Sequence, residues 1–178
     1  MGKYTGLLLI LLGIAGLIFA ASFIYQRNTP SRLAFRLTEI KSVETTQKIR
    51  RPTIIRIPTL DLELPIVPTK LENSRWQATS EGVSYLTTTP QPGESGNSIM
   101  YGHNWPNLLG RLKQVKPGQI IEVLFSDGNK STFEIAFTTV VTPDQTHILN
   151  QTDDRRLTLY TCTGFLDSKR FVVTAISS

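Results

Sequence analysis

Sulfur and imidazole are scarce in this chain of 178 residues, which contains one cysteine and two histidines. A single cysteine, Cys162, excludes an internal disulfide bond. No spacing of cysteine and histidine typical of a zinc site occurs in the sequence. Because a lone cysteine is most often a small buried apolar residue, any functional role for Cys162 depends on where the surrounding pattern places it.

Long apolar runs are equally rare, since the sequence has only one, near its N-terminal end. Residues 6–25 carry no charge and are rich in Leu, Ile, Ala and Gly. About 20 such residues can cross the hydrocarbon core of a bilayer as a helix. A cleaved signal peptide is the alternative, but it would have a shorter apolar core and a clear small-residue cleavage site. We therefore predict a membrane anchor over residues 1–25, with residues 6–25 in the bilayer.

Positive charge is concentrated in a short stretch after this run. Residues 26–51 hold seven Lys or Arg and two Glu, a net charge of +5, whereas residues 52–178 hold eleven basic and twelve acidic side chains, a net charge of −1. A nucleic-acid-binding domain would carry its positive charge on the folded domain, so no nucleic-acid partner is expected. Residues 26–51 are predicted to be a basic juxtamembrane stalk, which either contacts anionic headgroups or is simply solvated.

Within the stalk, apolar residues recur at helical spacing after a possible helix start at Thr29 and Pro30. This pattern predicts a short amphipathic helix that ends near residue 47 and either serves as a spacer or packs on the domain, with a disordered tether as the alternative. Its apolar positions are Leu33, Leu37, Ile40 and Val43.

The remainder, residues 52–178, is predicted to be one all-β domain. Short apolar runs alternate with turns rich in Pro and Gly, which is typical of a closed β-barrel with short helical turns. The strongest pair of strands, 119–125 and 131–141, flanks Asp127-Gly128, a sequence that favours a tight hairpin. The frequent prolines of residues 58–68 predict edge strands and turns, and disfavour central strand positions. Other expected strands are residues 54–57, 60–68, 83–86 and 98–101, and residues 107–112 are expected to form a helical turn.

Cys162 ends one of two strands that close the sequence. In residues 157–162, Leu157, Leu159 and Thr161 would face one side of the strand, and Thr158, Tyr160 and Cys162 the other. A second strand begins at Lys169, so pairing of the two would bring Arg170 close to Cys162. Upstream, His103 directly follows the strand 98–101. A thiol, an imidazole and a guanidinium at strand ends are the side chains that a cysteine transpeptidase requires.

These residues resemble a known family, the sortases. Thr158-Leu159-Tyr160-Thr161-Cys162 fits the sortase pattern Thr-Leu-x-Thr-Cys, Tyr101-Gly102-His103-Asn104 is similar to the segment with the catalytic histidine, and Arg170 lies where the family's arginine is expected. The resemblance covers residues 52–178 and implies an eight-stranded barrel behind one transmembrane helix. It also implies that the catalytic domain lies on the extracellular face of the membrane, although the arginines that follow the apolar run would place that side in the cytoplasm if the positive-inside rule were taken alone.

The resemblance implies a reaction for these side chains. Cys162 would attack a peptide carbonyl of a surface protein's C-terminal sorting signal, typically like Leu-Pro-x-Thr-Gly, and form a thioester. His103 would transfer protons, and Arg170 would stabilise the oxyanion or hold the substrate backbone. The acyl group would pass to an amine of the cell wall or of another surface subunit.

Other residues near the site have weaker assignments. Thr161, Tyr101 and Trp105 are candidate substrate-binding residues, although packing explains each of them as well, and His147 is expected on the surface. Some sortases bind calcium through acidic side chains, and Asp144, Asp153 and Asp154 are the residues that could do so here. We expect no metal or other cofactor, because scattered carboxylates are usually solvated.

Three other functions compete with this interpretation. An L,D-transpeptidase would show a different sequence around its cysteine, and a hydrolytic cysteine protease would release a free acid. A membrane-tethered barrel without catalysis would bind sorting peptides or wall components and carry an unreactive Cys162. Within the sortases, the stalk lacks the Asp-Pro-aromatic motif of many pilus-building enzymes, and the loop 142–154 is too short for an extra helix. These features favour a compact, general anchoring enzyme.

Overall fold

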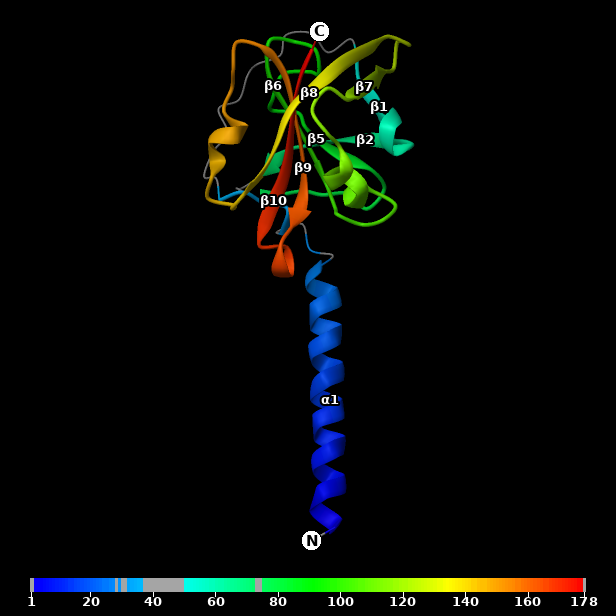
Figure 1. Ribbon diagram of the computed structural model, residues 1–178, viewed down its shortest axis with the longest axis vertical. Coiled ribbons are helices and arrows are strands. Elements are labelled where there is room, and N and C mark those ends of the chain that lie inside the picture. Colours follow the sequence, from blue (N-terminus) through cyan, green and yellow to red (C-terminus); the bar gives the residue numbers. More distant parts are fainter. Residues whose placement is uncertain (1, 28, 30–31, 37–49, 73–74, 178) are drawn as a thin grey trace.

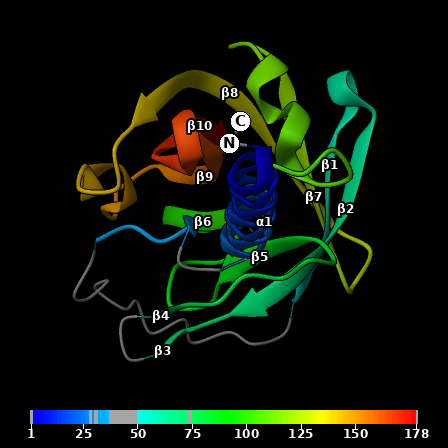
Figure 2. The same ribbon diagram turned by 90° about the horizontal axis from the view of Figure 1, so that it is seen from below.

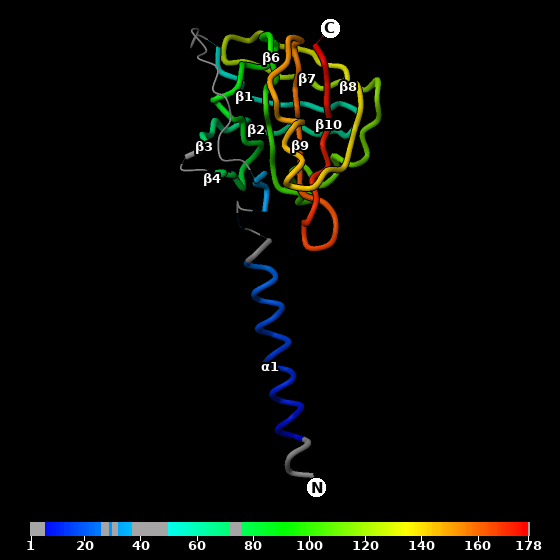
Figure 3. The backbone as a smooth tube through the Cα atoms, turned by 90° about the vertical axis from the view of Figure 1, so that its left-hand side faces the viewer, coloured from blue at the N-terminus to red at the C-terminus, as the bar shows by residue number. Residues whose placement is uncertain are grey.

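The computed structural model describes residues 2–27, 29, 32–36, 50–72 and 75–177. A single long helix, α1 (Gly2–Arg27), lies outside a β-barrel (Figure 1). The side view in Figure 3 shows the same separation. Seen along the long axis, the strands form a ring (Figure 2).

Helix α1 has the composition of the predicted anchor. Its segment Gly6–Tyr25 has a mean hydropathy of 2.8, none of it is buried by the rest of the chain, and its 20 residues would extend about 30 Å along the helix axis. That length matches the hydrocarbon core of a bilayer. In the part of the chain that the structure describes, α1 is the one helix that meets these criteria.

The predicted eight-stranded closed barrel is confirmed, with the strand order β1-β2-β5-β6-β9-β10-β8-β7. Neighbouring strands are antiparallel except for the pairs β2–β5 and β6–β9, which are parallel. A separate small sheet contains β3 (Leu71–Glu72) and β4 (Arg75–Trp76). The barrel strands are β1 (Pro52–Ile57), β2 (Leu62–Thr69), β5 (Val83–Leu86), β6 (Gly96–Gly102), β7 (Ile120–Phe125), β8 (Lys130–Val141), β9 (Arg155–Thr163) and β10 (Lys169–Ser177).

Short connections agree with the turn pattern of the sequence. The predicted hairpin joins β7 to β8, and Gly128 adopts a positive φ of 81°, a conformation that glycine reaches without steric cost. The helical turn expected after His103 is one of four 3₁₀ turns in the described residues. These turns are η2 (Pro58–Leu60), η3 (Leu109–Gln114), η4 (Thr146–Leu149) and η5 (Phe165–Asp167).

Pro58 begins the turn η2, as predicted. Pro65 and Pro68 lie in β2, which has neighbours on both sides and is therefore not an edge strand over its whole length. The reason lies in the register. Residues 62–65 of β2 pair with β1, whereas residues 66–69 pair with β5. Each half of β2 therefore has a partner on one side only, so its prolines occupy locally open positions that need no N–H donor.

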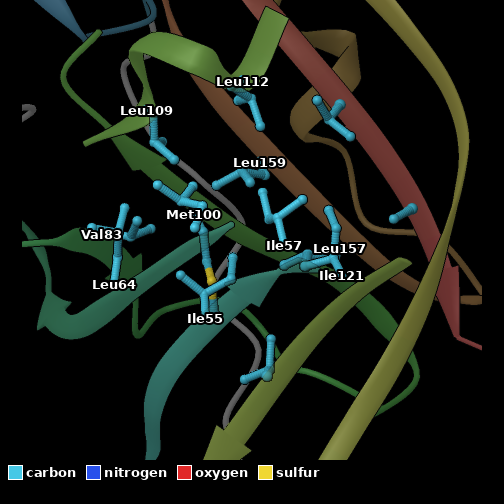
Figure 4. Packing of buried hydrophobic residues seen from close by; sticks show 14 of the residues in the cluster. Ile55, Ile57, Leu64, Val83, Met100, Leu109, Leu112, Ile121, Leu157 and Leu159 are labelled. Atoms are coloured by element: carbon cyan, nitrogen blue, oxygen red, sulfur yellow. The ribbon is translucent and has the colours of Figure 1, made fainter. Parts of the chain in front are cut away.

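Two hydrophobic clusters stabilise the domain, one inside the barrel and one on its outer face. The inner cluster includes Ile55, Met100, Leu157 and Leu159 (Figure 4). The outer cluster covers the opposite faces of β6 and β9. The predicted alternation along β9 is confirmed, because Leu157 and Leu159 pack inside whereas Tyr160 and Cys162 belong to the outer cluster.

The amphipathic helix predicted in the stalk is wrong for the part that the structure describes. Residues 34–36 are not helical, and the segment 32–36 packs on the outer cluster through the buried Leu33 and Phe35. Leu33 and Phe35 are two residues apart, and side chains two residues apart face the same side in an extended chain but not in a helix. The remaining positions of the predicted helix, residues 37–47, lie outside the described residues.

Gly82 directly precedes β5, and its backbone lies very close to the backbone of Pro65 in β2. This close approach predicts that a larger residue at position 82 destabilises the domain. A Cβ atom at this position would lie 2.1 Å from the carbonyl oxygen of Pro65, so the parallel β2–β5 pair would have to separate. We expect Gly82→Ala to lower the free energy of unfolding by about 1–3 kcal/mol, as overpacking does. Chemical denaturation of the full chain in detergent measures this change. The exposed neighbour Ser80 offers Ser80→Ala as a control, and equal stability of the two variants would contradict the prediction.

Candidate active site

Parallel pairing of β6 with β9 places His103 beside Cys162. The register ends with Gly102 opposite Thr161. His103 directly follows Gly102 at the end of β6, and Cys162 follows Thr161 on β9, so the two residues are neighbours. The hydroxyl of Thr161 donates to the carbonyl oxygen of Gly102 at 2.7 Å, which ties the strands together immediately before the two reactive side chains. The hydroxyl of Thr161, a candidate substrate-binding group, therefore donates its hydrogen bond to the neighbouring strand.

Antiparallel pairing of β9 with β10 brings in the third side chain. Arg170 is directly opposite Cys162 in the register, which confirms the predicted proximity. All three side chains are buried, and the exposed fraction of Cys162 is 2%. Three strands that meet at one end of the barrel thus bring together the thiol, the imidazole and the guanidinium.

Residues 32–36, here called the strap, cover the thiol and the guanidinium. The thiol of Cys162 donates to the carbonyl oxygen of Arg32 at 2.8 Å. Nη2 of Arg170 donates to the carbonyl oxygen of Ala34 at 2.8 Å, and the backbone N–H of Arg36 donates to Pro143 at 2.9 Å. The strap backbone therefore occupies hydrogen-bonding positions next to both Cys162 and Arg170.

Aromatic side chains hold the strap in place. The ring of Phe35 packs edge-on against Tyr160, with centroids 5.0 Å apart, and Trp76 donates its indole N–H to the carbonyl oxygen of Phe35 at 3.2 Å. Tyr101 stacks on Tyr160 with centroids 5.4 Å apart. The candidate substrate residue Tyr101 thus packs beneath the strap, where it also hydrogen-bonds Thr69.

Burial keeps the thiol protonated in this arrangement. Desolvation raises the pKa of Cys162 to about 12, with a smaller contribution from Asp167, whereas the positive charges of Arg170 and Arg32 oppose the increase. A thiol has one proton to donate, and here that proton points to the strap. Cys162 is therefore held as a neutral thiol while the strap is in place.

The imidazole of His103 is also favoured in its neutral form. Burial lowers its pKa below the ordinary value, and the nearby negative charge of Asp167 partly opposes this shift. The ring stacks on Trp105 with centroids 4.4 Å apart and an interplanar angle of 8°, so the candidate substrate residue Trp105 holds the histidine ring. A neutral imidazole is the form that can accept a proton from a thiol.

Arg170 is fixed by carbonyl groups. In addition to the strap, its Nη1 donates to the carbonyl oxygens of Asp167 and Lys169, both at 2.9 Å. In the described part of the chain, its buried Nε and the buried hydroxyl of Tyr160 have no hydrogen-bond partner. Since a buried unpaired donor is costly, these two groups favour an additional acceptor in this region.

Asp167 is a further residue of the site, and no motif in the sequence pointed to it. It adopts a positive φ of 58° in the β9–β10 connection. Its carboxylate accepts a hydrogen bond from Asn104 at 3.1 Å and lies 4.0 Å from a guanidinium nitrogen of Arg32. Asp167 thus links the β9–β10 connection to the residue after His103 and to the strap.

The remaining sequence candidates lie elsewhere. His147 is an exposed residue of η4, as expected. Asp154 forms an ion pair with Arg156 at 2.7 Å, which stabilises its ionised form and lowers its pKa. Within the ranges that the structure describes, no three His, Cys, Asp or Glu side chains are grouped closely enough to hold a metal ion.

Comparison with known proteins shows the family to which this chain belongs. The model of the sortase domain matches residues 55–177, which include His103, Cys162 and Arg170. This chain belongs to the sortase family.

Individual sortases are similar over most of the chain. Sortase A of Bacillus anthracis is 29% identical over 136 residues, which cover 74% of this chain but only 60% of that relative. The crystal structure of sortase C-1 from Actinomyces oris superposes with a TM-score of 0.63 and 26% identity, and it covers 89% of this chain and 98% of that one. A lid mutant of sortase A from Corynebacterium diphtheriae has the same TM-score with 22% identity, and covers 92% of this chain and 95% of that one.

The strap contacts predict that its removal exposes the sortase thiol. Replacing two buried apolar side chains, Leu33→Ser with Phe35→Ser, removes burial worth about 2–5 kcal/mol for each large side chain. We expect the rate of Cys162 alkylation by iodoacetamide at neutral pH to increase at least about tenfold, which corresponds to about 1.4 kcal/mol. Arg36→Ser is the matched control, because that side chain is exposed. An unchanged rate in a folded double variant would contradict a covering role.

The raised pKa of Cys162 predicts the pH dependence of the same reaction. Only the thiolate reacts readily, and an ordinary thiol ionises near pH 8.5. Because burial raises the pKa of Cys162 to about 12, the alkylation rate of the native chain should continue to increase above pH 9. In the strap double variant the profile should level off at lower pH. Mass spectrometry of the modified chain measures both profiles, with Cys162→Ser as the blank, and a native plateau at or below pH 8.5 would refute the prediction.

Proposed function

We propose that this protein is a membrane-anchored cysteine transpeptidase that cleaves a C-terminal sorting signal of surface proteins and transfers the acyl group to an amine. The observation that carries the proposal is the strand register, which brings Cys162, His103 and Arg170 to one end of the barrel. A thiol, a neutral imidazole and a fixed guanidinium together supply a nucleophile, a base and an oxyanion-stabilising donor. Membership of the sortase family supports the same chemistry.

The proposed reaction begins with transfer of the Cys162 proton to His103. The thiolate attacks the carbonyl carbon at the Thr–Gly bond of a Leu-Pro-x-Thr-Gly-like signal, and the carbonyl oxygen becomes an oxyanion near Arg170. Protonated His103 then gives its proton to the leaving amine, and a thioester remains on Cys162. An incoming amine loses a proton to His103 as it attacks the thioester, which releases the new amide and regenerates the thiol. The reaction uses side chains of this chain and no cofactor.

The strap must leave before a substrate can bind. Its carbonyl groups at Arg32 and Ala34 accept hydrogen bonds from Cys162 and Arg170, and a scissile carbonyl would need to occupy the same surroundings. Displacement would also return water and substrate dipoles to the thiol, which removes much of the desolvation that keeps it protonated. We therefore propose that the structure shows a closed form of the enzyme.

Partners and location follow from the same proposal. Helix α1 would anchor the protein by residues 6–25 as a single-pass segment, with the barrel on the extracellular face. The acceptor would be an amine of a cell-wall peptide or of another surface subunit. The loop between β8 and β9 contains only the short turn η4, which supports the compact, general anchoring type of sortase over one with an inserted helix.

One observation favours a different function, that of a non-catalytic barrel that binds sorting peptides or wall components. The thiol is buried and has a strongly raised pKa, as expected for an unreactive cysteine. A binder would show no covalent adduct at Cys162, and Cys162→Ala would leave peptide affinity unchanged.

The decisive experiment follows acyl transfer by mass spectrometry. The full chain in detergent is mixed with Leu-Pro-x-Thr-Gly-like peptides and a set of amines. We expect a thioester on Cys162 that is converted to an amide, no product with Cys162→Ala or His103→Ala, and a rate at least about a hundredfold lower with Arg170→Ala, the usual cost of losing an oxyanion donor.

Controls separate the alternatives in this experiment. Lys169→Ala serves as the matched control, because that side chain is exposed next to Arg170. Release of free acid without amide would indicate a protease. Absence of any adduct, in the strap double variant as well, would indicate the binding module.

A further inference from the structure

An exposed apolar tip projects from the end of the barrel where the active site lies. The connection between β9 and β10 carries Phe165, whose exposed fraction is 85%, and Leu166, with 43% exposed. Apart from α1, few large apolar side chains of the described residues are this exposed. Figures 1 and 3 both show this connection at the end of the domain that is nearest to α1.

The backbone of the tip holds its apolar side chains outward. Leu166 and Asp167 both have positive φ values, 54° and 58°, which L-residues adopt rarely and at some cost. The carbonyl oxygen of Leu166 accepts a hydrogen bond from Arg32, and the carboxylate of Asp167 accepts one from Asn104. The connection is therefore fixed by polar contacts behind the tip, whereas Phe165 has almost no contact with the rest of the domain.

The length of the chain limits how far the tip lies from α1. Helix α1 ends at Arg27, and Arg32 is bound at the active site by its hydrogen bonds to Cys162 and Leu166. Five residues of chain extend at most roughly 18 Å. Arg32, which contacts the β9–β10 connection, can therefore lie no farther than roughly 18 Å from the end of a membrane-spanning α1, which keeps this connection close to the membrane surface.

From this we propose that Phe165 and Leu166 insert into the lipid headgroup region, so that the active-site end of the barrel rests on the membrane surface. The proposal rests on the membrane-anchored form of the proposed function. Aromatic and aliphatic side chains favour this interface, and the exposed Lys169, which follows the tip in the sequence, complements anionic headgroups. The proposed occupant is thus the lipid surface itself, and the tip is a second attachment in addition to α1.

Tryptophan fluorescence tests the proposal with the full chain. Phe165→Trp is reconstituted into vesicles of phosphatidylcholine and phosphatidylglycerol, and the phosphatidylcholine is replaced by its brominated form. Phe137→Trp is the matched control, since Phe137 is an exposed phenylalanine (47%) on β8, opposite Thr174 and away from the tip. After subtraction of the native chain's signal, we expect bromine to quench the tryptophan at 165 several-fold more than the tryptophan at 137. Equal quenching would overturn the proposal.

A kinetic comparison provides the second test and separates this proposal from the proposed function. Phe165→Ser should lower kcat/KM several-fold for a sorting peptide that is anchored in the same vesicles, and should leave a soluble peptide unaffected. Equal losses with both peptides would mean that Phe165 contacts the peptide, which overturns the lipid contact. If the native chain transfers no peptide at all while the tryptophan at 165 is quenched, the transpeptidase function fails and the lipid contact stands.

Discussion

The active site depends on one constraint, the pairing of β9 with a parallel partner on one side and an antiparallel partner on the other. The register with β6 places His103 beside Cys162, and the register with β10 places Arg170 opposite it. Side chains alternate along a strand, so a shift of one residue would turn Cys162 into the barrel and Thr161 out of it. The inner cluster that contains Leu157 and Leu159 opposes such a shift, because it would bring apolar side chains to the outer face.

The second determinant of the site is the exclusion of water. The strap adds two apolar side chains to the outer cluster and covers the thiol. Burial favours the neutral forms of both Cys162 and His103. A thiolate with an imidazolium would need water or substrate dipoles to stabilise its charges. The same apolar surroundings can therefore keep the thiol unreactive when the strap is bound and strengthen electrostatic interactions with a substrate when it is not.

The sequence contains enough information to predict most of this arrangement, and the missing part has an identifiable reason. Alternation along residues 157–162 predicted which side chains of β9 face outward, and Asp127-Gly128 predicted the β7–β8 hairpin. The extended conformation of the strap and its contact with Cys162 were not predicted, because Leu33 also fits a helical series with residues 37, 40 and 43, and that longer pattern obscured the two-residue alternation of Leu33 and Phe35. Asp167 acts through its backbone conformation and through partners distant in the chain, which spacing does not reveal.

The strap also connects access to the active site with the position of the domain. While Arg32 is bound at Cys162, five residues join the barrel to the end of α1. When the strap leaves, 24 residues (28–51) lie between Arg27 and the first strand at Pro52, and the maximum reach of this stretch increases to roughly 85 Å. Under the proposed function, opening by itself would therefore let the domain move away from the bilayer at the step in which the sorting-signal substrate binds at Cys162. A lipid contact at Phe165 resolves this conflict, because it lies on the β9–β10 connection and not on the strap, and so holds the open site at the membrane surface.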